Sequence, residues 1–209
     1  MTLYLNELKI NIKQFIIWSL TIGLICLGCI TLFTSYKDDL SSMADSFSNM
    51  EGFSAALGMD QISISTMEGY FAAEVAVIYA LGGAMFAALL FISILSKEEE
   101  GHTSEFLLTL PKSRIQVLLS KYLAGVTLVI LFDLICNILF AIGFACSGES
   151  IEVSTLLQFA LLQLMMHLEI GSICFLLSSL FKKSKLELSI SIIIGSFPIK
   201  LCFIDNGLK

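Results

Sequence analysis

Five polar side chains lie within apolar stretches long enough to cross a membrane, and their chemistry stands out in this 209-residue sequence. Asp133 and Asn137 are four residues apart, as are Gln163 and His167, so each pair lies on one face of a helix. Glu169 is about 200° around the helix from His167, which prevents the two from pointing into one narrow site. Such groups at membrane depth form hydrogen bonds between helices, line a polar translocation path, or bind a cation or proton. The sequence leaves these alternatives open.

The composition indicates that the elements carrying these residues lie in a membrane. The mean hydropathy is +0.89 and 56% of the residues are hydrophobic. Only 14% are charged, against roughly 25% in an ordinary soluble domain. No basic stripe with interleaved aromatic residues supports binding to nucleic acid. We therefore predict one all-α, multi-pass membrane domain over residues 1–209, located in the cell membrane.

Five segments are long and apolar enough to cross a bilayer as helices, which takes about 20 residues each. They are residues 15–33, 75–96, 122–145, 156–181 and 188–204. Their length and lack of alternation argue against an outer-membrane barrel. The first segment follows Lys9 and Lys13 but has no small-residue cleavage site, so we predict an uncleaved first helix.

Basic residues concentrate in alternate connections. Nine of the twelve lie in the N-terminus, in residues 97–121 and in residues 182–185. Residues 36–74 carry seven acidic residues and one lysine, and residues 147–155 carry two acidic residues and no basic one. Because lysine and arginine accumulate on the cytoplasmic side, we predict a cytoplasmic N-terminus, a cytoplasmic 97–121 segment and an extracytoplasmic 36–74 segment.

Two segments flank the first predicted span. Ahead of it, the apolar residues from Leu3 to Phe15 suit either a helix lying on the inner leaflet or a cytoplasmic extension of the first helix. Beyond it, apolar residues spaced by three and four predict short amphipathic helices on the outer surface. We expect these helices to be interrupted near Gly58 and again near Gly69.

A row of small residues marks the second predicted span. Alanine recurs at every fourth position beside a pair of glycines at 82 and 83. Such a row leaves a smooth groove in which another helix can approach closely. We predict a helix-packing face, within the chain or between subunits, formed by Ala76, Ala80, Ala84 and Ala88 and preceded by Ala72.

Motifs of the common catalytic sites do not occur in the sequence. No G-x-x-x-x-G-K-[ST] loop is present to hold a nucleotide, and neither H-E-x-x-H nor G-x-S-x-G occurs. Cys26 and Cys29 form a C-x-x-C inside the first span, without a histidine or a second pair nearby. We expect no enzyme activity, no metal and no bound cofactor in this chain.

A polar segment, Lys97 to Lys121, separates the second and third spans and holds four basic residues, four acidic residues and a short apolar patch at 106–110. Ser113 with Gln116 predicts a capping box that opens the helix of the third span. Pro111 disfavours helix in the residue before it. We predict a short helix over 103–110, a break and a re-entering helix, with an amphipathic loop lying on lipid as the alternative.

The run EEGHTSEFLLTLPKSR, residues 99–114, followed by Ser120-Lys121, resembles the permease subunits of type-2 ATP-binding-cassette exporters. The likeness is greatest to bacterial members whose ATPase is a separate polypeptide. Further similarities are Glu7-Leu8-Lys9 ahead of the first span and the Gly58, Ser65, Gly69-Tyr70 positions.

The resemblance implies that residues 97–121 dock on an ATPase subunit, which would bind ATP and magnesium. It also implies a second permease copy in the assembly. The residues implied in ATPase coupling are Glu100, Gly101, Thr103, Glu105, Phe106, Leu110, Pro111 and Arg114.

Members of that class usually have six spans, whereas five are visible here, so we expect a C-terminally truncated member. The sequence predicts an exporter permease that uses ATP hydrolysed on a partner. Two alternatives stay open at this point. One is an ion-coupled secondary transporter using Asp133, His167 and Glu169, and the other is a membrane immunity or assembly factor without transport.

Overall fold

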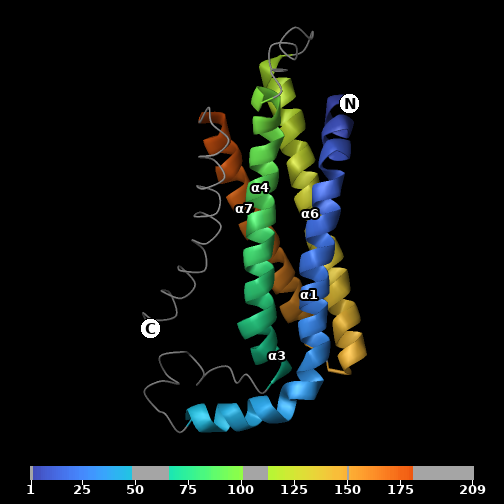
Figure 1. The fold of residues 1–209 in the computed structure, drawn as a ribbon, viewed down its shortest axis with the longest axis vertical. Coiled ribbons are helices and arrows are strands. Elements are labelled where there is room, and N and C mark those ends of the chain that lie inside the picture. Colours follow the sequence, from blue (N-terminus) through green and yellow to red (C-terminus); the bar gives the residue numbers. More distant parts are fainter. Residues whose placement is uncertain (1, 49–65, 101–112, 150, 181–209) are drawn as a thin grey trace.

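A computed structural model describes residues 2–48, 66–100, 113–149 and 151–180, and the secondary-structure elements in these ranges are all helices. Figure 1 shows the four long helices side by side as an upright bundle. The elements are α1 (Thr2–Ser48), α3 (Met67–Tyr70), the π-helix η1 (Phe71–Val75), α4 (Ala76–Glu100), α6 (Arg114–Ser147) and α7 (Val153–Leu180).

Four stretches of these helices are long and apolar enough to cross a membrane: Leu3–Ser42, Met67–Leu95, Ile115–Ser147 and Val153–Ser179. They confirm the all-α prediction and correspond to the first four predicted spans. The fifth predicted span, residues 188–204, lies outside the described residues, so the number five stays a prediction.

Helix α1 extends beyond the first predicted span, residues 15–33, at both ends. It is continuous from Thr2, so the segment ahead of the first span is an extension of the first helix, which was one of the two alternatives. Beyond Phe33 the helix continues to Ser48, and Figure 1 shows its last part, in light blue, turning across the end of the bundle. The start of the predicted outer segment is therefore part of α1. The predicted break near Gly58 lies outside the described residues.

The predicted break near Gly69 is wrong. Thr66 caps α3, because its hydroxyl accepts a hydrogen bond from the backbone nitrogen of Gly69 at 3.2 Å. The chain then continues as helix through η1 into α4, so this span begins at Met67 rather than at Val75. A glycine inside a helix costs only about 1 kcal/mol, and the neighbouring Phe71 is buried, which favours continuation.

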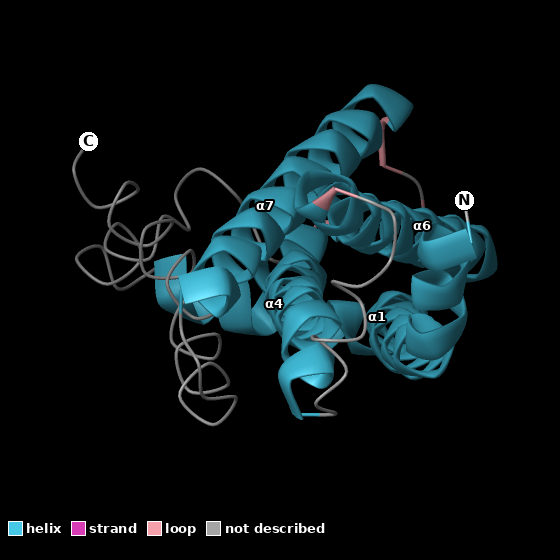
Figure 2. Ribbon diagram, turned by 90° about the horizontal axis from the view of Figure 1, so that it is seen from above, coloured by secondary structure: helices cyan, strands magenta, loops and turns pink. Residues whose placement is uncertain are grey.

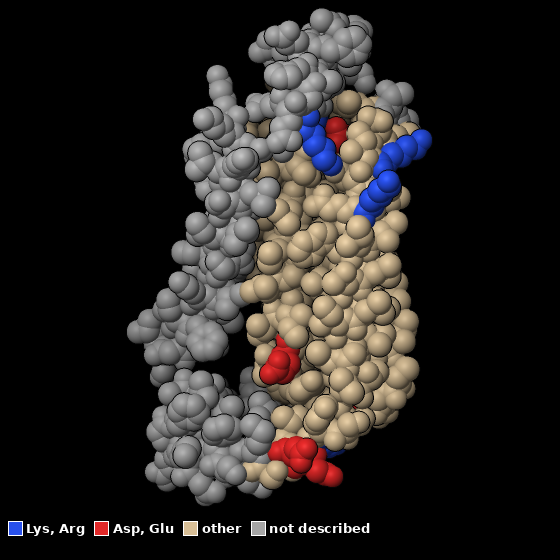
Figure 3. All heavy atoms as spheres, in the orientation of Figure 1, with Lys and Arg blue, Asp and Glu red and all other residues tan. Residues whose placement is uncertain are grey.

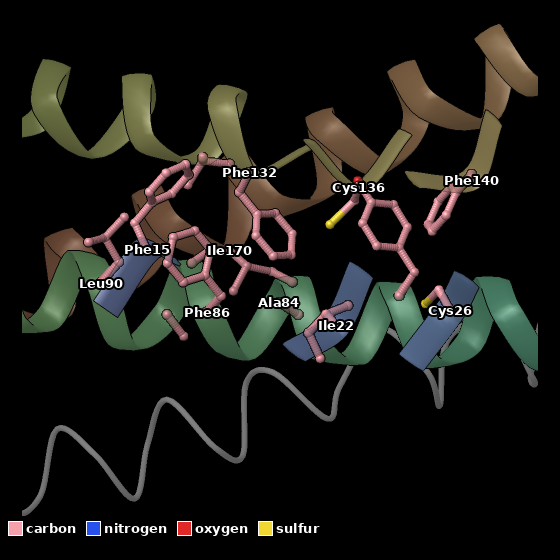
Figure 4. Packing of buried hydrophobic residues seen from close by; sticks show 14 of the residues in the cluster. Phe15, Ile22, Cys26, Ala84, Phe86, Leu90, Phe132, Cys136, Phe140 and Ile170 are labelled. Atoms are coloured by element: carbon pink, nitrogen blue, oxygen red, sulfur yellow. The ribbon is translucent and has the colours of Figure 1, made fainter. Parts of the chain in front are cut away.

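The alanine row is only partly buried. Residues four apart in an α-helix are separated by about 400°, so each alanine lies about 40° further around the helix than the one before it. Ala72, inside η1, is exposed, whereas Ala84 and Ala88 are buried in the core. Ala76 and Ala80 are half-buried. Figure 4 shows Ala84 within the packed cluster of apolar side chains.

Helix α4 is the centre of the bundle. It contacts α1, α6 and α7, with α7 as its main neighbour, while α1 packs mainly on α6. The view from above in Figure 2 shows α4 between α1 and α7. In the most apolar stretch of the span that contains α4, 61% of the residues are buried, against 28% in the span of α7. Because α4 contacts α1, α6 and α7, a displacement of α4 would affect all three.

Candidate functional site

A polar cluster lies in the middle of the bundle, with Tyr79 from α4, Asp133 from α6 and His167 from α7. Nδ1 of His167 lies 2.9 Å from Oδ1 of Asp133, and the Tyr79 hydroxyl donates a hydrogen bond to the same oxygen. His167 is fully buried and Asp133 is 4% exposed. One carboxylate oxygen therefore joins three helices. We call these three residues the Asp133 cluster.

Aromatic rings surround the Asp133 cluster. The Tyr79 ring is stacked with Phe132 at a centroid distance of 6.1 Å and meets Phe140 edge-on at 5.1 Å. The His167 ring meets Tyr79 edge-on at 5.3 Å and Phe132 at 6.1 Å. Figure 4 shows Phe132 and Phe140 on α6, facing α4. An apolar surrounding strengthens a hydrogen bond and makes each unpaired polar atom costly.

Some polar atoms of this region have no hydrogen-bond partner. They are Oδ2 of Asp133 and Nε2 of His167, together with Oε1 of Gln163 one turn earlier on α7. A Cβ atom on Gly83 would lie 2.3 Å from both Nε2 and Cε1 of His167. The edge of the imidazole thus lies against the backbone of α4, at a position that only glycine allows without a shift of the ring.

The other polar residues singled out in the sequence lie around the Asp133 cluster in different ways. Asn137 donates from Nδ2 to the backbone carbonyl of Asp133 at 2.7 Å, within α6. Gln163 is half-buried. Glu169 is on the exposed side of α7, away from His167, as the angle between them predicted. The structure therefore brings Asp133 and His167 together and keeps Glu169 apart from them.

A second cluster of charged and polar residues lies at the end of the bundle that holds the N-terminus. The Lys121 ammonium is 3.1 Å from the Glu7 carboxylate, and Nζ of Lys97 donates to Oδ1 of Asn11 at 2.7 Å. We call Glu7, Asn11, Lys97 and Lys121 the α1 clamp. Sequence reasoning placed Lys97 and Lys121 at the borders of the polar segment but did not predict their partners in α1.

Most of the residues predicted to couple to an ATPase lie outside the described ranges: Gly101, Thr103, Glu105, Phe106, Leu110 and Pro111. Glu100 ends α4 and Arg114 begins α6. The predicted capping box is confirmed. The Ser113 hydroxyl accepts a hydrogen bond from the backbone nitrogen of Gln116 at 3.3 Å. In return, Oε1 of Gln116 accepts one from the backbone nitrogen of Ser113 at 3.4 Å.

On the face shown in Figure 3, the charged side chains lie mainly toward the two ends of the bundle. In Figure 3 most of the visible lysine and arginine atoms are at the end near the N-terminus, and most of the acidic ones are at the other end. At that other end, Lys37 pairs with Glu149 at 2.5 Å on the surface. The middle of this face is largely uncharged, which fits a belt surrounded by lipid.

The cysteines of the first span do not form a metal or disulfide site in the described part of the chain. Cys26 is buried and Cys29 half-buried, and neither forms a disulfide there. The Sγ atom of Cys26 lies 4.0 Å from the carbonyl oxygen of Val75 in η1. Within the same ranges, no three His, Cys, Asp or Glu side chains converge as metal ligands would.

Comparison with known proteins identifies a family. The family model described as "ABC-2 family transporter protein" matches residues 1–197, which include all the described helices and the 97–121 segment. No curated protein and no solved structure matches the chain.

Proposed function

Because the chain belongs to the ABC-2 family of transporter proteins, we propose that it is the permease subunit of an exporter driven by a separate ATPase. The family match, with four helices long and apolar enough to cross a membrane, carries this proposal. The sequence has no P-loop. ATP and magnesium would therefore bind to the partner, and the permease itself would supply no catalytic residue.

The 97–121 segment is the proposed docking site for the ATPase subunit. It connects α4, the central helix of the bundle, to α6. Movement of this segment during ATP hydrolysis would shift α4 relative to its neighbours and alternate the access of the substrate path. The coupling residues implied by the family resemblance, from Glu100 to Arg114, belong to this segment.

The proposed orientation places the N-terminus and the 97–121 segment in the cytoplasm, which puts the ATPase on the correct side. The excess of basic residues at that end supports this orientation. A membrane-impermeant maleimide tests it on single cysteines introduced at Lys9 and at Glu152, in a variant without native cysteines. Intact cells should label position 152 and not position 9, and the reverse pattern would invert the orientation.

The Asp133 cluster is proposed to tie α4, α6 and α7 together during transport. The distance of 2.9 Å between Nδ1 of His167 and Oδ1 of Asp133 supports this role. The alternative is that Asp133, Asn137, Gln163, His167 and Glu169 line the translocation path. Unchanged transport with lowered thermal stability in Asp133→Ala and His167→Ala supports the tie. Lost transport in variants of unchanged stability would support the path.

Co-purification with an ABC-type ATPase, sought first in the neighbouring reading frames, tests the proposed function. We expect the two subunits to purify together, and the association to be lost when Glu105, Leu110 and Arg114 are replaced. Lys112→Gln in the same segment is the matched control, because Lys112 is not among the residues implied in coupling. We also propose a second permease copy in this complex, and the molecular mass of the purified complex tests for it.

Transport without any ATPase would contradict the proposal. If an ion gradient alone drives transport, the chain is a secondary transporter that uses Asp133, His167 and Glu169, and the exporter proposal is wrong. If the chain neither binds an ATPase nor transports a substrate, the remaining alternative is a membrane immunity or assembly factor.

A further inference from the structure

The α1 clamp connects both ends of the 101–112 segment to the same two turns of one helix. Lys97 precedes the segment in the last turn of α4, and Lys121 follows it in the early turns of α6. Their partners, Glu7 and Asn11, are one helical turn apart on α1. A displacement of residues 101–112 is therefore linked to α1 from both sides.

The contact on the α6 side is buried. Glu7 is 5% exposed and Lys121 is 2% exposed, so their ion pair lies inside the bundle, where removing one partner of a buried pair is costly. Nζ of Lys121 also donates to the carbonyl oxygen of Ile94 at 2.8 Å, near the end of α4. One ammonium group thus connects α1, α4 and α6.

The contact on the α4 side passes through Asn11, which is fully buried. Its Oδ1 accepts from Lys97 at 2.7 Å, and its Nδ2 donates to the backbone carbonyl of Glu7 at 2.9 Å. These two hydrogen bonds hold the amide in one orientation. Asn11 therefore connects Lys97 to the same turn of α1 that holds Lys121.

We propose that Glu7 and Asn11 are positioning residues of the transport cycle, which make α1 move with the 97–121 segment when the ATPase displaces that segment. The inference rests on the proposed function, because it requires a partner that acts on the segment. It adds α1, a helix outside the segment, to the route of the motion. Lysine suits such a link, because its flexible four-carbon stem lets the helices tilt while the ammonium contact persists.

The experiment uses the complete transporter, purified with its ATPase and reconstituted in liposomes. Spin labels on cysteines introduced at Lys13 in α1 and Ser179 in α7, in a variant without native cysteines, report the distance between these helices. In the protein whose α1 clamp is unaltered, we expect ATP with vanadate to shift this distance. In Glu7→Gln the shifted population should fall about fivefold, a typical size for coupling between two sites. Glu7→Asp, which keeps the carboxylate, should retain most of the shift.

Two further variants keep the inference testable. Asn11→Leu breaks the link on the α4 side with all charges intact, so it serves if Glu7→Gln does not fold. Lys9→Gln, an exposed residue of the same helix, is the matched control and should leave the shift unchanged.

The outcomes separate this inference from the proposed function. If the ATPase does not bind the unaltered chain, the proposed function fails. If the complex forms and hydrolyses ATP but Glu7→Gln and Asn11→Leu keep the full shift, only the inference is overturned. It is also overturned if the shift disappears only together with thermal stability or ATPase binding, because the clamp would then be merely structural.

Discussion

The Asp133 cluster and the α1 clamp both bury charged groups, but they differ in how fully their polar atoms are paired. In the clamp, Lys121 meets a carboxylate and a carbonyl, and Asn11 uses both ends of its amide. In the Asp133 cluster a single oxygen accepts two donors, while Oδ2 of Asp133 and Nε2 of His167 have no partner. Both sites join helices, but the Asp133 cluster also keeps an acceptor oxygen and a ring nitrogen that a new partner could contact.

The largest effect is expected from Asp133→Ala. The substitution leaves the Tyr79 hydroxyl and the His167 imidazole without their acceptor, so the free energy of unfolding should fall by about 3 kcal/mol. Asn137→Ala is the control, because its amide bonds only within α6, and should cost less than about 1 kcal/mol. Reversible unfolding in mixed detergent micelles measures both. Equal losses would mean that the cluster does not join the helices.

A double-mutant cycle on Glu7 and Lys121 comes next. With Glu7→Gln and Lys121→Met, we expect a coupling free energy of about 2 kcal/mol. It should persist at high salt, because buried pairs are poorly screened. The exposed pair Lys37 and Glu149 is the comparison, where coupling should be about 0.5 kcal/mol and should vanish in salt. Similar values for the two pairs would show that burial gives the clamp no advantage.

Gly83→Ala should have a smaller effect that is specific to the Asp133 cluster. The new methyl group would meet the His167 ring at 2.3 Å, so the ring must move, at a cost of roughly 1–2 kcal/mol. Gly28→Ala is the control, because nothing lies within 4 Å of its Cβ position, and it should not destabilise the protein. The shift of the His167 ring signals by NMR distinguishes ring displacement from a general packing defect. Unmoved signals would contradict the close approach.

The smallest effect concerns Lys97 in the clamp. Lys97 is an exposed residue, but partial desolvation still lowers its pKa below the ordinary value of 10.5, while Glu7 raises the pKa and the charge of Lys121 lowers it. Between the lowered pKa and 10.5 the folded protein binds fewer protons than the unfolded chain, so stability should rise with pH in that window. Lys97→Met should abolish this rise, and Lys13→Met, at an exposed position, should keep it. The free energy of unfolding measured across the alkaline range tests this prediction, and a fall in stability with pH would contradict the lowered pKa of Lys97.

The predictions that the structure confirms depend on local signals. Hydropathy over about 20 residues located the first four spans, and the Ser113 and Gln116 pair located the start of α6. The break near Gly69 was wrong, because one glycine does not outweigh a capped start at Thr66 and buried neighbours. Helix α1 continues past the end of the first predicted span, since its polar last turns carry no breaker before Ser48.

The candidate sites were only partly visible in the sequence. Asp133 and His167 stood out because ionisable groups are rare at membrane depth. Tyr79 and Gly83 did not, because an aromatic residue and a glycine are ordinary in an apolar helix. Their importance comes only from the groups that face them. Glu7 was noticed as part of a family resemblance, but its ion pair with Lys121 was not predicted.

The sequence by itself determined that the protein is helical, that it lies in a membrane, and where α6 begins. These properties follow from hydropathy and from hydrogen bonds between residues close along the chain. The tertiary structure decided that Tyr79, Asp133 and His167 share one oxygen and that Glu7 meets Lys121. The physical reason is that such pairs depend on how each helix is rotated and placed against its neighbours, and the packing of the whole bundle sets both.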